Sequence, residues 1–172
     1  MILVELMNNG IKPTKEYNDD GGFDLYTPER FSVPSQEKVL LKIKVLIPIG
    51  WTALIRPRSS TYRQGLEVNG TIDRYTGEIF LTIKNSKAHR GPIVFKKGDR
   101  IAQLIPTWTG AGFNLKILHD LTENQIDSPT HGTPISYLRT LVELLSACNQ
   151  MKVVDKLPKT DRSERGGGSS GR

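Results

Sequence analysis

The stretch KVLLKIKVL, residues 38–46, decides the fold class. Four aliphatic side chains stand at every second position in it, namely Val39, Leu41, Ile43 and Val45. A period of two is typical of a β-strand that buries one face, because successive side chains of a strand point to opposite sides. The chain is therefore expected to build its core from strands.

Short runs rich in β-branched and aromatic residues flank this strand on both sides. They are separated by turns that contain Gly, Pro and Asn. The runs cover residues 2–6, 23–26, 31–33, 51–55, 78–85, 92–95, 101–105 and 151–157. Many short strands at this spacing are typical of a sandwich or a barrel. The sequence predicts an all-β, jelly-roll-like barrel.

The segment from about residue 110 to 150 interrupts this pattern. Thr133 is placed to cap a helix that begins at Pro134, and apolar residues then recur on one helical face. One inserted amphipathic helix is predicted here. From residue 158 onward Lys, Asp, Arg, Gly and Ser predominate, which predicts a flexible C-terminal arm. The expected organisation is a β domain over 1–157 that carries the 110–150 insert, followed by an arm over 158–172.

The composition excludes several classes of protein and favours an anionic partner. The chain has 172 residues with 24 Lys and Arg against 18 Asp and Glu, a net charge of +6 that favours an anionic partner. Its single cysteine, Cys148, excludes an internal disulfide framework and a cysteine zinc site. The longest apolar run, residues 45–49, contains Pro48, and the N-terminus resembles no secretory signal. A soluble, intracellular protein of the cytoplasm or nucleus is expected, with no membrane partner.

Two polar stretches carry residue types that suit phosphate chemistry. Arg58, Ser59 and Ser60 follow an apolar strand, and a guanidinium beside two hydroxyls can hold a phosphate. The same residues would also make an ordinary solvated turn. Asp73 and Tyr75 lie in a stretch that is predicted to form a tight hairpin, residues 69–78. Asp73 could act there as general base for a water, or simply stabilise the turn.

Five stretches, taken in their order and spacing, indicate a function more specifically than any one of them does. These stretches are residues 21–26 (GGFDLY), 57–60 (PRSS), 70–77 (GTIDRYTG), 98–104 (GDRIAQL) and 163–171, which holds SERG and GSSG. In this order they resemble the five motifs of the trimeric dUTP pyrophosphatases (dUTPases). The resemblance covers about residues 1–108 and 151–172.

The resemblance implies a homotrimer whose three active sites are each shared among the chains. It implies hydrolysis of dUTP to dUMP and pyrophosphate with Mg²⁺, which is held mainly by the triphosphate and waters. Asp73 would activate the water that attacks the α-phosphorus, and Gln103 would help to orient that water. Asp24 would belong to the polar network beside the metal-bound waters.

The resemblance also implies the residues that bind the substrate. The backbone around Asn69 and Gly70 would read uracil, and Tyr75 would pack on the deoxyribose and exclude a 2′-hydroxyl. The phosphate chain and the closing arm involve a larger group of Arg and Ser side chains. These are Arg58, Ser59 and Ser60 for the phosphates, and Arg165, Ser169 and Ser170 for the arm that closes over a neighbouring chain's site.

The chain departs from the family pattern in three places. Asp73 and Tyr75 are two positions apart where the family usually has three, and the stretch 68–70 is shorter than usual. The arm lacks the aromatic that in the family stacks on uracil, with Gly167 at the nearest position. Its arginine is aligned best with Arg165, the alternative being Arg162. The 110–150 insert stands where the family has a short connection, either as a packing element or as a surface for an unknown protein partner.

Three functions other than dUTP hydrolysis would each place their own demands on the sequence. A dCTP deaminase would need a catalytic Glu where this chain has Thr82. A catalytically weakened nucleotide-binding or regulatory protein would fit the shortened 69–78 turn. A barrel that binds nucleic acid specifically would need exposed aromatics between Lys and Arg on its strands, and only 7% of the residues are aromatic.

Overall fold

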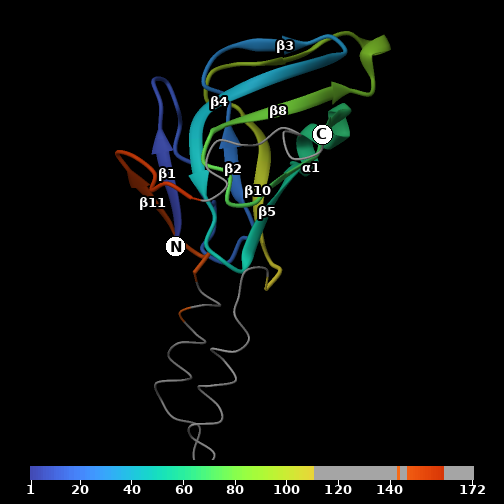
Figure 1. Ribbon diagram of the computed structural model, residues 1–172. Helices are drawn as coiled ribbons and strands as arrows, with labels where there is room; N and C mark the ends of the chain where they lie inside the picture. The colour runs from blue at the N-terminus through green and yellow to red at the C-terminus, as the bar shows by residue number, and fades with distance from the viewer. Residues whose placement is uncertain (111–142, 144–146, 161–172) are drawn as a thin grey trace, which may run out of the picture.

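The described residues form two curled β-sheets and a two-stranded ribbon (Figure 1). The computed structural model describes residues 1–110, 143 and 147–160. The first sheet has the strand order β11 (Met151–Val154), β1 (Ile2–Leu6), β4 (Gln36–Leu46), β8 (Glu78–Asn85) and β6 (Leu66–Val68). The second has the order β2 (Phe23–Tyr26), β10 (Arg100–Trp108), β5 (Trp51–Pro57) and β7 (Gly70–Ile72). The ribbon pairs β3 (Phe31–Val33) with β9 (Ile93–Phe95).

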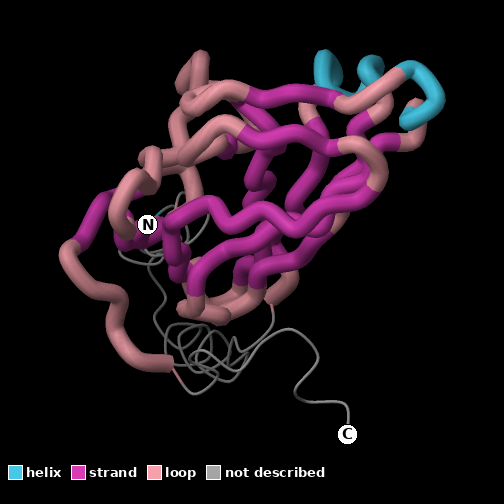
Figure 2. The backbone as a smooth tube through the Cα atoms, turned by 90° about the horizontal axis from the view of Figure 1, so that it is seen from above, coloured by secondary structure: helices cyan, strands magenta, loops and turns pink. Residues whose placement is uncertain are grey.

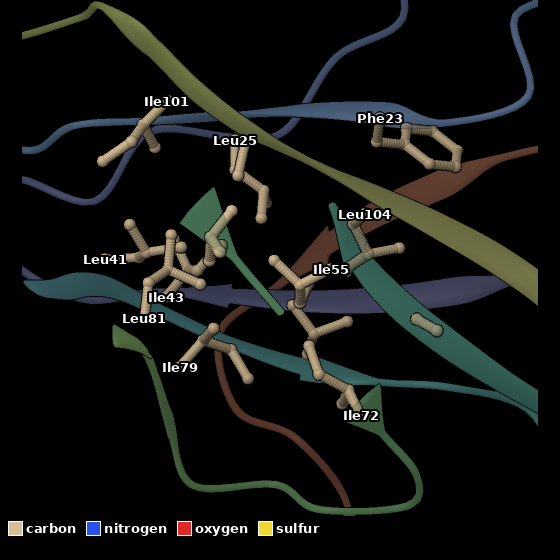
Figure 3. Close-up of a cluster of buried hydrophobic side chains, with 14 of the residues drawn as sticks. Phe23, Leu25, Leu41, Ile43, Ile55, Ile72, Ile79, Leu81, Ile101 and Leu104 are labelled. Atoms are coloured by element: carbon tan, nitrogen blue, oxygen red, sulfur yellow. The ribbon is translucent and has the colours of Figure 1, made fainter. Parts of the chain in front are cut away.

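The core lies between the two main sheets. The four alternating aliphatic residues of β4, from Val39 to Val45, are all buried, as their spacing predicted. Figure 3 shows side chains of β4 and β8, such as Ile43 and Leu81, facing side chains of β2 and β10, such as Leu25 and Leu104. This all-β, jelly-roll-like arrangement confirms the predicted fold class.

Two short helices lie together at one end of the sheets (Figure 2), namely α1 (Ser59–Gln64) and the single 3₁₀ turn η1 (Ala88–Arg90). The sequence did not predict them, nor β6 between them. Gly65 ends α1 with a φ of 101°, a left-handed conformation that glycine adopts without a steric cost. The Lys87 ammonium donates a 2.8 Å hydrogen bond to the carbonyl of Arg63 and so joins the two segments.

The predicted hairpin over 69–78 is wrong in its pairing. β7 pairs antiparallel with β5, and β8 pairs with β4 and β6, so the chain crosses from one sheet to the other over residues 73–77. Stacked sheets lie about 10 Å apart, a gap that five residues span easily. Residues 73–77 therefore form a link between the two sheets.

Two sequence predictions cannot be compared with the fold. The helix expected after Thr133, apart from Glu143, and the arm residues beyond Thr160 lie outside the described residues. The last strand is present but ends at Val154, three residues before its predicted end at Leu157. Over the described part of the chain, the helices are too short to cross a lipid bilayer.

Candidate functional site

Asp24 is the centre of a polar cluster on the four-stranded sheet. Its side chain is buried, and its Oδ1 atom lies 2.9 Å from Nε of Arg58. Its Oδ2 atom accepts a hydrogen bond from Arg100 Nη1 at 3.1 Å, and Gln103 Nε2 lies 3.4 Å from Oδ1. The antiparallel register of β2 and β10 places Asp24 directly opposite Gln103. The structure thus brings together three of the predicted site residues, and Asp24, Arg58, Arg100 and Gln103 are called the Asp24 cluster below.

Arg100 belongs to this cluster although the sequence had assigned it no role. It joins Asp24 to Glu16, whose Oε2 atom lies 2.7 Å from the same Nη1 atom. These hydrogen bonds with Asp24 and Glu16 raise the pKa of Arg100 above its ordinary value. The signal was present in the sequence, because Arg100 lies inside the GDRIAQL stretch, three residues before Gln103.

A second group of predicted residues lines one cavity of about 220 Å³. Asn69, Gly70, Asp73 and Tyr75 are among its lining residues. The other lining residues come from β5, β7 and β8 and are mostly apolar. They are Ile55, Thr71, Ile72, Ile79, Phe80, Leu81 and Thr82. A cavity lined by apolar and polar groups together has the form of a small-molecule site. It is called the β7 cavity below.

Two side chains of β5 form hydrogen bonds with residues that line the β7 cavity. Thr52 Oγ1 donates a 2.6 Å hydrogen bond to Oδ1 of Asp73, which is itself an exposed residue. Arg56 donates to the side-chain oxygen of Asn69. Sequence reasoning assigned a role to neither Thr52 nor Arg56, because it treated the strand 51–55 as core and Arg56 as its polar end.

Tyr75 is half-buried and packs against the hydrophobic core. Its phenol ring covers the backbone of Gly77, where a Cβ atom would overlap the ring and its oxygen. The missing side chain of Gly77 therefore lets the ring fold back toward the β7 cavity.

The remaining predicted residues lie in two places. Ser59 and Ser60 are exposed and form the first turn of α1, directly after Arg58. Arg165, Ser169 and Ser170 lie outside the described residues. The described part of the arm ends at Thr160, whose hydroxyl donates a 2.9 Å hydrogen bond to the carbonyl of Arg74, next to Asp73.

Within the described residues, the Asp24 cluster and the β7 cavity have no residue in common. The described part of the chain includes no group of three or more His, Cys, Asp or Glu side chains that could hold a metal ion. Asp24 accepts hydrogen bonds from two guanidinium groups, those of Arg58 and Arg100.

The fold and these two groups define a class: a jelly-roll-like β protein with a small cavity of mixed polar and apolar lining and a separate Arg-rich polar cluster. The dUTPase family model matches residues 8–136, which is well over half of the chain. The chain therefore belongs to the dUTPase family.

Two relatives show how far this similarity extends in sequence. The deoxyuridine 5′-triphosphate nucleotidohydrolase of Mycobacterium marinum is 38% identical over 100 residues, which cover 54% of this chain and 64% of that protein. The enzyme of the same name from Nocardia farcinica is 41% identical over 100 residues, covering 54% of this chain and 60% of that protein. The chain thus spans less than two thirds of the length of these relatives.

Solved structures show the same fold. The dUTPase from phage phi11 of S. aureus is 25% identical, with a TM-score of 0.57 over 63% of this chain and 90% of that one. The native EIAV dUTPase, 24% identical, is similar in fold with a TM-score of 0.56 over 78% of this chain and 98% of that one.

Proposed function

We propose that this chain hydrolyses dUTP to dUMP and pyrophosphate by in-line attack of water on the α-phosphorus. This activity limits uracil incorporation into DNA and supplies dUMP for dTMP synthesis. The relatives named deoxyuridine 5′-triphosphate nucleotidohydrolases support the substrate. The observation that carries the proposal is that Asn69, Gly70, Asp73 and Tyr75 line one cavity.

The β7 cavity would hold the nucleoside. The backbone around Asn69 and Gly70 is the start of an edge strand, so its N–H and C=O groups can pair with the edge of uracil as a further strand would. The half-buried ring of Tyr75 would pack on the deoxyribose and leave no room for a 2′-hydroxyl.

Asp73 would act as general base. Its exposed carboxylate is held at the cavity by Thr52, and a carboxylate within hydrogen-bond reach of a water can take its proton as the water attacks. Gln103 would orient that water through its side-chain amide.

The separation of Gln103 from the β7 cavity supports a homotrimer with shared sites. In one chain Gln103 contacts Asp24, and neither residue lines the cavity that Asp73 lines. A second copy of the chain whose β7 cavity lies against the Asp24 cluster would complete the active site.

The phosphate chain would lie along Arg58, Ser59 and Ser60. Asp24 contacts Nε of Arg58 and so fixes the plane of the guanidinium, which favours directional hydrogen bonds to phosphate oxygens. Arg165, Ser169 and Ser170 of the arm would close over the γ-phosphate. Mg²⁺ neutralises phosphate charge when bound, and Asp24 would contact its waters. A related phage dUTPase coordinates a structural Mg(II) ion, which supports this cofactor.

The experiment that tests the function is pyrophosphate release from dUTP, dTTP, dCTP and UTP by the wild type and by Asp73→Asn. Turnover is expected to be largely confined to dUTP and to fall by at least about 100-fold in Asp73→Asn, since general-base catalysis contributes 10²–10⁴. A folded trimer without turnover of any nucleotide would contradict the proposal and favour a nucleotide-binding or regulatory protein. The shortened Asp73–Tyr75 spacing is the observation that favours this alternative.

Four further points are proposals that rest on the sequence and on the family. The chain is organised as a β domain over 1–157 with an arm over 158–172, and the 110–150 insert is either a packing element or a contact for a protein partner. The protein acts inside the cell and binds no specific nucleic acid sequence.

A further inference from the structure

β7 is a three-residue strand at the edge of its sheet, and side chains of β5 hold the residues at both of its ends. The backbone register pairs Gly70 with Ile55 and Ile72 with Ala53. One step beyond each pair, Arg56 donates to Asn69 and Thr52 donates to Asp73. β7 is therefore bracketed by two cross-strand side-chain pairs.

The pair of Thr52 and Asp73 has the geometry of a charge-assisted hydrogen bond. Its Oγ1–Oδ1 distance is 2.6 Å, within the range of about 2.5–2.7 Å that hydroxyls keep to ionised carboxylates. The carbonyl of Ile72 lies farther from the hydroxyl, at 3.1 Å. Thr52 is buried, so this hydroxyl is held in one place by the sheet around it.

Side-chain hydrogen bonds of this kind matter for β7 because the strand is short and lies at the edge of its sheet. An edge strand of three residues has few backbone hydrogen bonds, and Gly70 has no side chain to pack. Beyond Ile72 the chain leaves this sheet for the other one. Short edge segments open locally at a low free-energy cost unless side chains hold them.

We propose that Thr52 and Arg56 are positioning residues that fix the two ends of β7, so that Asp73 and Asn69 keep their places at the cavity. Thr52 orients the carboxylate that activates water. Arg56 orients the segment that reads the base. The proposal rests on dUTP hydrolysis for its kinetic consequences, whereas its structural consequence is independent of any activity.

The kinetic test of the Thr52 end uses Thr52→Val, which removes the hydroxyl and keeps the shape of the side chain. We expect kcat to fall by about tenfold with KM nearly unchanged, because a misplaced base affects the reaction more than binding. Thr52→Ser, which restores the hydroxyl, is expected to recover most of the loss. The matched control is Thr107→Val on β10, which lies opposite Thr52 in the register and donates to Ile105 instead.

The test of the Arg56 end is a double-mutant cycle with Arg56→Met and Asn69→Ala. If Arg56 acts by holding Asn69, each variant raises KM for dUTP and the double variant raises it no further than the stronger single one. Additive increases would show that Arg56 attracts the anionic substrate without holding Asn69, and they would overturn this half of the proposal.

A measurement without substrate separates this inference from the proposed function. Hydrogen–deuterium exchange of the backbone amides of residues 69–75 is expected to be about tenfold faster in Thr52→Val and Arg56→Met than in the wild type and Thr107→Val. If the wild type hydrolyses no nucleotide but exchange changes as expected, the proposed function fails and the positioning role stands. Unchanged exchange together with unchanged kcat in Thr52→Val would overturn the proposal.

Discussion

The Nε atom of Arg58 lies 2.9 Å from Oδ1 of Asp24, and this contact ties the residue before α1 to a buried carboxylate of β2. Asp24→Asn removes the charge that two guanidinium groups share. We expect the free energy of unfolding to fall by about 2 kcal/mol, since hydrogen bonds to charged groups contribute about 1.5–3 kcal/mol. Thermal or denaturant unfolding measures this loss, with Asp155→Asn at an exposed position as the control.

The same variant separates structure from activity in the Asp24 cluster. Because Arg58 loses the partner that fixes its plane, dUTP turnover is expected to fall by at least about tenfold under conditions where the variant is fully folded. A stable variant with wild-type turnover would contradict the role given to the cluster.

Gly77 is expected to control sugar selectivity through Tyr75. In Gly77→Ala the new methyl group would overlap the phenol ring, so the ring must leave its place beside the β7 cavity. The ring is the end of a side chain and can move, so stability should change by less than about 1 kcal/mol. The ratio of kcat/KM for dUTP to that for UTP is expected to fall by about tenfold, within the 1–3 kcal/mol that one small group contributes to discrimination. An unchanged ratio would show that Tyr75 does not exclude the 2′-hydroxyl.

The sequence predicted the strands well because a buried sheet imposes its period on the chain. The alternation from Val39 to Val45 is such a period, and it needs no knowledge of the strand's neighbours. The same period does not predict which strands pair with one another. The stretch 69–78 contains the residues of a hairpin, but its two strands belong to different sheets, which only the packing of the whole chain decides.

The site residues also fall into two groups: those that a sequence motif identifies, and those whose role depends on a contact made only in the folded chain. The motifs that carry Asp24, Arg58 and Gln103 lie far apart in sequence, and in the structure Arg58 and Gln103 each contact Asp24. The partner of Asp73 was missed, because Thr52 looks like part of an apolar strand and its contact with Asp73 depends on the register of β5 and β7. Cross-strand contacts of this kind join residues far apart in sequence and leave no local pattern.

Cys148 is expected to be almost unreactive in the folded protein. Its side chain is buried, and burial raises the pKa of its thiol to about 11, so very little thiolate is present near neutral pH. Alkylation by iodoacetamide at pH 8 is expected to be at least about 100-fold slower in native protein than in denaturant, because the thiolate is the nucleophile. Equal rates in the two conditions would show that the thiol is accessible in the native state.

Glu5 links the first strand to the segment that precedes the arm, and this link should make stability depend on pH. Its Oε2 atom accepts a 2.9 Å hydrogen bond from the backbone of Leu157, and its Oε1 atom lies 3.2 Å from Nζ of Lys44. The Leu157 hydrogen bond, and then Lys44, lower the pKa of Glu5 below its ordinary value of 4.5. A carboxylate with a lowered pKa stabilises the folded state fully above its unfolded pKa, and this contribution is lost as the pH falls through the folded value.

Glu5→Gln is therefore expected to lower the free energy of unfolding at pH 7 by about 1 kcal/mol, since a neutral amide is a weaker acceptor than a carboxylate. The difference from the wild type should shrink as the pH falls below 4.5, because the wild-type carboxyl is then protonated as well. Urea unfolding at a series of pH values measures both effects, with Glu29→Gln at an exposed carboxylate as the control. A difference between Glu5→Gln and the wild type that stays constant through the acid range would show that the charge of Glu5 does not hold Leu157 in place.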